Sequence, residues 1–137
     1  SIYQVLKRLE EKNLVYSKKE KEGRMPERKR YYITEEGRIA LSEASKRLLS
    51  NFERYYLDFN VGLEASDLLT PGEIASCIVK RLARVQTNIQ RMREMYADEK
   101  VAAFKKKAVI RNLTRLREAE ENFLKEFLQE LSTGEYQ

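Results

Sequence analysis

Apolar residues recur at helical spacing at the start of the chain. Ile2, Leu6 and Leu9 occupy i, i+4 and i+7 positions on one helical face, with Val5 beside them. Asn13 follows, and asparagine tolerates the left-handed conformation in which many helices end. The pattern predicts a helix from residue 2 to about Asn13, with an apolar face that needs a core to cover it.

Two short runs of apolar and aromatic residues follow, at 14–16 and 31–33, and they are typical of strands. Between them, Gly23 and Pro26 interrupt a segment that is almost wholly charged. Residues 18–30 contain seven cations and three anions, a local net charge of +4. We therefore predict a hairpin with a long, flexible basic tip, for which phosphate is the favoured partner.

The other side of the first helix carries aromatic, amide and cationic groups. Such a surface suits the major groove of DNA, where glutamine can pair with an adenine edge and arginine with a guanine. The side chains concerned are Tyr3, Gln4, Lys7 and Arg8. The alternatives are a solvated helix face and, for the hairpin, a solvated turn, since charge runs usually face water.

Three segments of the first 41 residues carry a family resemblance in combination: IYQVLKRLEEKNLVYS, GRMPERKRYYIT and EEGRIAL. Together they resemble the winged helix-turn-helix of PadR-type transcriptional regulators. The resemblance implies a recognition helix, a wing hairpin and a helix that leads to a C-terminal dimerisation domain. It assigns the groove contacts to Tyr3, Gln4, Lys7 and Arg8, and the wing contacts to Arg24, Pro26, Arg28 and Lys29. Because PadR-type regulators place two further helices before the recognition helix, we expect residues 1–41 to hold only part of the DNA-binding fold.

Beyond the hairpin the spacing becomes helical again. Thr34 is placed to cap a helix that begins at Glu35 and Glu36, where the helix dipole favours anions. Apolar positions continue this helix through Leu41, Ala44, Leu48 and Phe52. Asn60 and Gly62 interrupt the pattern before a short helix near Leu68.

An aromatic group closes this region, formed by Phe52, Tyr55, Tyr56 and Phe59. Core packing is the favoured interpretation of these side chains. The alternative is a pocket for a small effector, because the resembled family senses phenolic or other hydrophobic compounds and then releases DNA.

Thr70, Pro71 and Glu73 give a strong helix start, with a cap, a proline in the first turn and a capping box. A long apolar stripe follows, at Ile74, Ile78, Leu82, Val85, Ile89, Met92 and Tyr96. The intervening cations predict a basic outer face, made of Lys80, Arg81, Arg84, Arg91 and Arg93.

A second stripe predicts a last helix that begins at Asp98 and ends near Gly134. Its members are Val101, Phe104, Ala108, Leu113, Leu116, Phe123, Phe127 and Leu131. Two such helices pair antiparallel, but one pair cannot also cover Val109, Ile110, Leu124 and Leu128, so we predict a homodimer. The candidate dimerisation residues are Ile78, Leu82, Val85, Ile89, Phe104, Leu113, Leu116 and Phe123.

Composition narrows the class of protein. The chain is 42% hydrophobic and 36% charged, which is typical of a soluble helical protein, and no apolar run reaches the length of a membrane span. We expect a cytoplasmic protein. Of the net charge of +5, +4 lies in residues 1–38, which hold eleven cations and seven anions.

Chemistry other than binding has little support. The sequence has no histidine, no nucleophile with an adjacent base and no phosphate-binding glycine loop, so we predict neither an enzyme nor a cofactor or metal site. The single cysteine, Cys77, neighbours the apolar stripe and is expected to be a small buried hydrophobe.

The sequence thus predicts a mostly α protein with a small β-hairpin wing. Residues 1–41 form a partial winged helix-turn-helix, and residues 42–137 form an antiparallel helical dimerisation and effector domain. The expected function is a ligand-responsive repressor that binds a pseudo-palindromic operator in double-stranded DNA as a homodimer. The alternative is a helical interaction module whose basic hairpin docks a protein partner.

Overall fold

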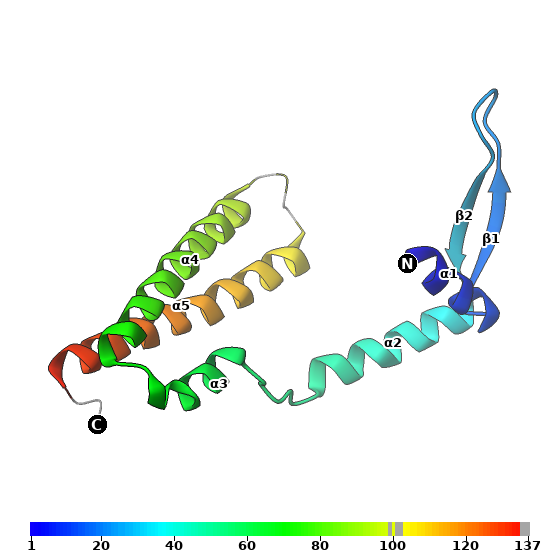
Figure 1. Cartoon of the computed structure of the whole chain (residues 1–137). Helices are drawn as coiled ribbons and strands as arrows, with labels where there is room; N and C mark the ends of the chain where they lie inside the picture. The colour runs from blue at the N-terminus through cyan, green and yellow to red at the C-terminus, as the bar shows by residue number, and fades with distance from the viewer. Residues whose placement is uncertain (99, 101–102, 135–137) are drawn as a thin grey trace. The chain divides into compact units, whose positions relative to one another are not determined.

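The computed structural model describes residues 1–98, 100 and 103–134, and all structural statements refer to these residues. They form five α-helices, one short 3-10 helix and one two-stranded antiparallel sheet (Figure 1). The predicted mostly α fold with a small hairpin is confirmed. The chain divides into an N-terminal unit, residues 1–55, and a C-terminal unit, residues 56–137. The functional boundary expected after residue 41 stays a prediction, and it falls within one helix.

Helix α1 (Ile2–Glu11) forms where the apolar spacing predicts it. Asn13 adopts the left-handed conformation, with φ at 57°. The backbone N–H of Leu14 donates to the carbonyl of Leu9 at 2.9 Å, and that of Asn13 to Glu10 at 2.9 Å. These two bonds are those of a Schellman motif. The apolar face of α1 has no buried residue, and Ile2 is 71% exposed.

The hairpin consists of β1 (Val15–Glu20) and β2 (Arg28–Ile33), paired antiparallel from Val15↔Ile33 to Glu20↔Arg28 (Figure 1). The prediction of short strands with a long loop was wrong. Much of the charged run pairs in the ladder, and only residues 21–27 connect the strands. Long charged side chains are tolerated on these strands because most of them project into solvent.

Helix α2 (Glu35–Ser50) is capped by Thr34, as predicted. The Thr34 hydroxyl accepts the Gly37 N–H at 2.9 Å and donates to the Asn13 carbonyl at 2.7 Å. Gly37 is buried, and a Cβ there would clash with the carbonyl oxygen of Leu14. The end of α1, the start of β1 and the start of α2 are therefore locked together. The helix ends at Ser50, before the expected Phe52.

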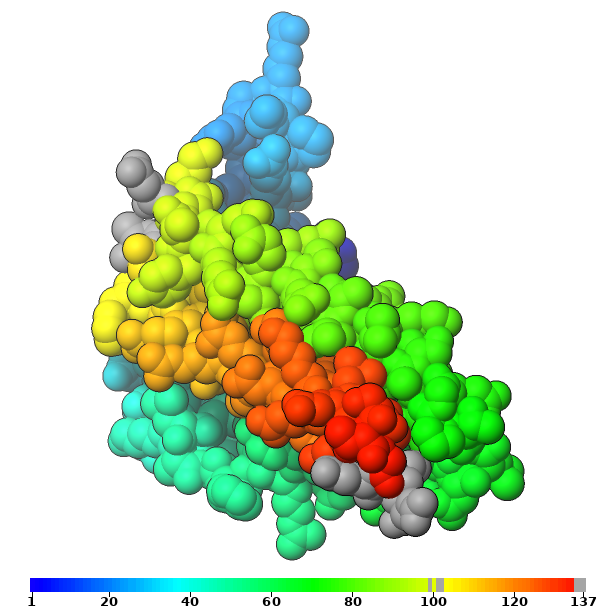
Figure 2. Space-filling model, turned by 90° about the vertical axis from the view of Figure 1, so that its left-hand side faces the viewer, coloured from blue at the N-terminus to red at the C-terminus, as the bar shows by residue number. Residues whose placement is uncertain are grey.

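The C-terminal unit begins with α3 (Asp58–Glu64) and the 3-10 helix η1 (Ser66–Leu68). Asn60 and Gly62 lie within α3, so the expected interruption at these residues is wrong. Helix α4 (Pro71–Ala97) starts at the predicted capping box, in which the Glu73 carboxylate accepts the Thr70 N–H at 2.8 Å. Helix α5 (Phe104–Thr133) runs back along α4, and Figures 1 and 2 show the two helices side by side. The predicted antiparallel pair is confirmed.

The segment between α4 and α5 corrects one boundary. We expected the last helix to begin at Asp98, but α5 begins at Phe104. The Asp98 carboxylate accepts the Lys100 backbone N–H at 2.9 Å, which is an Asx turn rather than a helix cap. Val101, expected to open the second stripe, lies outside the described residues.

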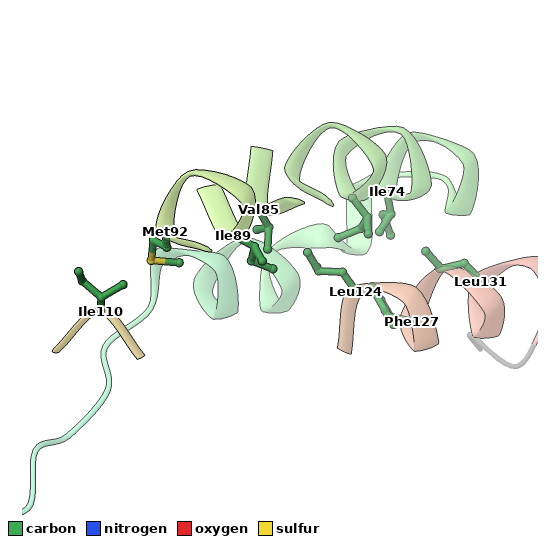
Figure 3. Close-up of a cluster of buried hydrophobic side chains, with 9 residues drawn as sticks. Ile74, Val85, Ile89, Met92, Ile110, Leu124, Phe127 and Leu131 are labelled. Atoms are coloured by element: carbon green, nitrogen blue, oxygen red, sulfur yellow. The ribbon is translucent and has the colours of Figure 1, made fainter. Parts of the chain in front are cut away.

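All the buried hydrophobic side chains described by the structure lie between α4 and α5 (Figure 3). Helix α4 contributes five members of its predicted stripe, namely Ile74, Ile78, Val85, Ile89 and Met92, whereas Leu82 is half-buried and Tyr96 is exposed. Helix α5 contributes Ile110, Leu124, Phe127 and Leu131. Ile110 and Leu124 were expected to be surplus to the pair, whereas Phe104, Leu113, Leu116 and Phe123 were expected in the stripe and are exposed. Helix α5 has two neighbouring apolar stripes, and only one of them can face α4.

Two cations that were expected on the basic outer face of α4 instead pair with carboxylates of α5. Arg81 pairs with Glu120 of α5, and Arg93 pairs with Glu118 at 2.8 Å. They join the two helices instead of facing solvent alone. Among the described residues, no helix combines the length and the apolar character that a membrane span requires.

Candidate nucleic-acid interface

The polar face of α1 is open to solvent. Tyr3, Gln4, Lys7 and Arg8 are all exposed, and Tyr3 is 77% exposed. Lys7 and Arg8 have no carboxylate within ion-pair distance among the described residues. Four groups that can donate to or stack on a nucleic acid are therefore presented within about two turns of helix.

One face of the hairpin carries an aromatic pair covered by a cation. The rings of Tyr16 and Tyr32 stack with centroids 5.4 Å apart, and the Lys18 Nζ lies 5.8 and 5.7 Å from them. Glu20 accepts the Tyr32 hydroxyl at 2.8 Å and pairs with Arg30 at 3.4 Å. These contacts fix the side chains of this face without burying them.

The opposite face of the hairpin is tied to α1 through Glu10. Its carboxylate accepts the Ser17 hydroxyl at 2.5 Å and the Lys29 ammonium at 3.2 Å. The pKa of Glu10 is lowered, first by the hydrogen bond from Ser17 and second by the hydrogen bond from Lys29. The bond between Lys29 and Glu10 also raises the pKa of Lys29. The Lys29 Nζ also lies 5.1 Å from the Tyr31 ring centroid. The cluster of Glu10, Ser17 and Lys29 orients the hairpin relative to α1.

Most cations of the charged run are unpaired. Lys19, Lys29 and Arg30 pair with Glu27, Glu10 and Glu20. The other four, within residues 18–30, have no carboxylate within ion-pair distance: Lys18, Lys21, Arg24 and Arg28. Two of the four predicted wing residues, Arg24 and Arg28, are in this group. Pro26 is exposed beside them in the loop, whereas Lys29 is held by Glu10.

Sequence reasoning missed several residues of this surface: Glu10, Tyr16, Ser17, Lys18, Arg30 and Tyr32. The signal was the alternation of strand positions, which places Tyr16, Lys18 and Glu20 on one face. It went unused because the predicted strands stopped at Tyr16 on one side and began at Tyr31 on the other.

The candidate dimerisation residues fall into two groups. Ile78, Val85 and Ile89 are buried within the helix pair of one chain, and Leu82 is half-buried against that core. The four candidates on α5 are exposed and thus accessible to a partner: Phe104, Leu113, Leu116 and Phe123. Phe123 also packs edge-to-face on Phe59 of α3, with centroids 6.2 Å apart.

The prediction that the aromatic residues near the boundary of the two units pack in a core is wrong for three of the four. Phe52, Tyr55 and Tyr56 are exposed, Phe52 by 91%, and only Phe59 packs against the core. Segment 51–57 has no regular structure, so it lacks the helical periodicity that would bury one face. The effector-pocket alternative for these side chains stays a prediction.

Cys77 is exposed, which contradicts the expected burial. It lies one position before Ile78 on α4, on the solvent side of the buried stripe. Within the described part of the chain, no group of three or more cysteine, histidine, aspartate or glutamate side chains is placed to hold a metal ion.

With helix, hairpin and capped α2 in place, the N-terminal unit has a helix followed by a hairpin in the order expected of a winged helix. The family model described as "Transcriptional regulator PadR-like family" matches residues 1–43. No curated protein matches the chain.

Solved structures match over almost the whole chain. Bacillus subtilis PadR in complex with operator DNA has a TM-score of 0.81 at 17% identity, over 95% of this chain and 76% of that one. A Streptococcus mutans protein has a TM-score of 0.65 at 22% identity, over 93% and 76%. A PadR-like transcriptional regulator from Bacillus cereus has a TM-score of 0.65 at 26% identity, over 95% and 74%. The resemblance to PadR-type regulators and the winged-helix fold are confirmed.

Proposed function

We propose that this protein is a sequence-specific DNA-binding transcriptional regulator that acts as a homodimeric repressor. The observation that carries the proposal is the N-terminal unit, in which the open polar face of α1 stands beside a hairpin with four unpaired cations. The match to the PadR-like family covers the same residues. The solved complex of Bacillus subtilis PadR with operator DNA supports DNA as the partner.

The residue types assign the roles on DNA. Arg8 offers two donors for a guanine edge in the major groove, and the Gln4 amide offers one donor and one acceptor for an adenine edge, with Lys7 and Tyr3 beside them. Arg24, Arg28 and Lys18 offer charge to phosphates, which sets affinity and position but not sequence choice. The ion pair between Glu10 and Lys29 connects the hairpin to α1, which would help both to engage one duplex.

The homodimer is supported by a self-complementary surface on α5. Val109, Leu113, Leu116 and Phe123 are exposed and recur at spacings of four, three and seven, so they share one face. Residues 104–117 of this helix hold six cations and no anion, whereas residues 118–133 hold five anions and one cation. The sign changes at the middle of the apolar stripe, so a two-fold axis there would set the basic half of each α5 against the acidic half of its partner.

Placing a charge in the stripe tests the dimer. The L116D variant should dissociate to monomers in light scattering, because an unpaired carboxylate would be buried at the centre of the interface. The L68D variant is the control, since Leu68 is 96% exposed in η1 and outside the stripe. A monomeric wild-type protein would contradict the proposed dimer.

A dimer gives the proposed mechanism of repression. Two recognition helices about 34 Å apart would read the half-sites of a pseudo-palindrome. A small hydrophobic or phenolic effector would release DNA only by favouring a dimer geometry with a different spacing.

A second function is favoured by the Tyr16–Tyr32 stack under Lys18, because exposed aromatic and cationic groups also suit a protein partner. In that case the hairpin would dock an acidic protein surface. Base preference separates the two functions, because a protein-docking module would not distinguish one DNA sequence from another.

The proposed function is tested with the full chain and DNA from its own promoter region. R28A and R24A should weaken binding to all sequences, while Q4A should relax the choice of base at particular positions. The matched control is R84A, which removes the same charge from α4. Absence of any DNA complex at low salt would overturn the proposal.

A further inference from the structure

The C-terminal unit carries a second basic site on α5. It lies on the side of this helix opposite the exposed apolar stripe of Val109, Leu113, Leu116 and Phe123. A hollow of about 330 Å³ lies between α4 and α5 and is lined by Arg93, Tyr96, Arg111, Thr114, Arg115 and Glu118. This volume lies within the range of small-molecule sites, at its lower end.

The charges around the hollow are not balanced. Among the described residues that line it, Glu118 is the one carboxylate, and it pairs with Arg93 through one guanidinium nitrogen at 2.8 Å. Arg111 and Arg115 are exposed and have no carboxylate within ion-pair distance among the described residues. Since guanidinium groups carry five donors each, most of the donors around the hollow are free for a ligand.

The position of these cations on α5 adds to the imbalance. Lys107, Arg111 and Arg115 follow one another at intervals of four residues, so they form a column with steps of about 6 Å along the helix. Lys107 lies over the ring of Tyr96 at 5.3 Å from its centroid, which places the column beside α4. Like charges at this spacing destabilise an isolated helix, so an anion along the column would relieve repulsion.

The other flank of the helix pair shows how the same fold balances arginines. There Arg81 and Arg117 both bind Glu120, and the Arg81 guanidinium also lies 4.5 Å from the Phe59 ring centroid. No carboxylate lies within ion-pair distance of Arg111 or Arg115 among the described residues. The column is therefore built differently from the structural ion pairs of this unit.

We propose that this hollow binds a small di- or polyphosphate, with successive phosphoryl groups on Arg111 and Arg115. Arginine suits this ligand because its planar fork donates two parallel hydrogen bonds to phosphate oxygens. Arg93 and Lys107 flank the anion, and binding joins α4 to α5. The site is independent of the DNA-binding surface and of the apolar stripe, so it stands whether or not the proposed function holds.

The test is calorimetric titration of the full chain with inorganic pyrophosphate, without DNA and at fixed ionic strength. The wild-type protein should show saturable binding. The R111Q/R115Q variant should weaken it by on the order of tenfold or more, the loss expected for charge-assisted hydrogen bonds. The R84Q/R91Q variant removes the same charge from α4 outside the hollow and should bind as the wild type does.

Absence of saturable binding by the wild type, or equal losses in the two double variants, would overturn the site. If R111Q/R115Q fails to fold by circular dichroism, R111K/R115K replaces it, because it keeps the charge and removes the fork. We expect weaker binding than in the wild type, and equal binding would contradict the assignment to Arg111 and Arg115.

Discussion

The two units of this chain are stabilised by different interactions. The C-terminal unit contains every buried hydrophobic side chain among the described residues, all of them between α4 and α5. The N-terminal unit contains none, and its only buried residue is Gly37. Apolar packing stabilises the α4–α5 pair. Backbone hydrogen bonds, the Thr34 cap and the Glu10 carboxylate stabilise the arrangement of α1, the hairpin and the start of α2. The second kind of structure leaves aromatic and cationic side chains free for a partner.

The largest expected effect is on the packed unit. Leu124 is fully buried, so L124A should lower the free energy of unfolding by about 3 kcal/mol, through lost burial and the cavity that remains. Calorimetric unfolding measures this loss. The control L68A, at an exposed leucine, should unfold like the wild type. Equal behaviour of the two variants would mean that the α4–α5 core does not hold this unit.

The next effect concerns the unit without a core. G37A should destabilise the N-terminal unit by about 2 kcal/mol, because the new Cβ would clash with the Leu14 carbonyl and would lie 2.8 Å from the Ile33 side chain. Faster exchange of the Thr34 amide hydrogen reports the loss, since it bonds to the Leu14 carbonyl across this junction. G62A in α3 is the matched control, because a Cβ there meets nothing within 4 Å. Unchanged exchange in G37A would contradict the locked junction.

The smallest effect is a pH dependence at Glu120. Burial raises the pKa of Glu120, but hydrogen bonds from Arg117 and Arg81 outweigh it, so the pKa is lowered in the folded chain. The resulting stabilisation is present above the ordinary glutamate pKa and is lost as the pH falls through the lowered value. E120Q should therefore be less stable than the wild type at neutral pH, with a free energy of unfolding lower by less than about 1 kcal/mol. Thermal unfolding measures this difference, which should vanish in acid. E126Q is the control. A difference that persists in acid would contradict the assigned cause.

Local signals in the sequence predicted their elements well. Asn13, Thr34 and the Thr70 capping box act on the backbone within a few residues, so the ends that they mark are visible without the fold. The polar face of α1 followed in the same way from helical spacing.

Non-local choices could not be predicted. Helix α5 carries two apolar stripes one position apart, and only its packing on α4 selects Ile110 and Leu124 over Leu113 and Leu116. The strands were expected to stop before the charged run, yet much of that run pairs in the ladder, and Glu10 holds Lys29 from nineteen positions away. Arg81 and Arg93 likewise find their carboxylates only on the partner helix.

The N-terminal unit is the proposed surface for DNA phosphates and base edges. Its most direct test is the affinity of the full chain for promoter DNA over a range of salt concentrations, for the wild type and for R24A/R28A. We expect the affinity of the wild type to fall steeply with salt, and the double variant to lose about two units of the logarithmic slope. A slope that is flat, or equal in the two proteins, would contradict the proposed role of this surface.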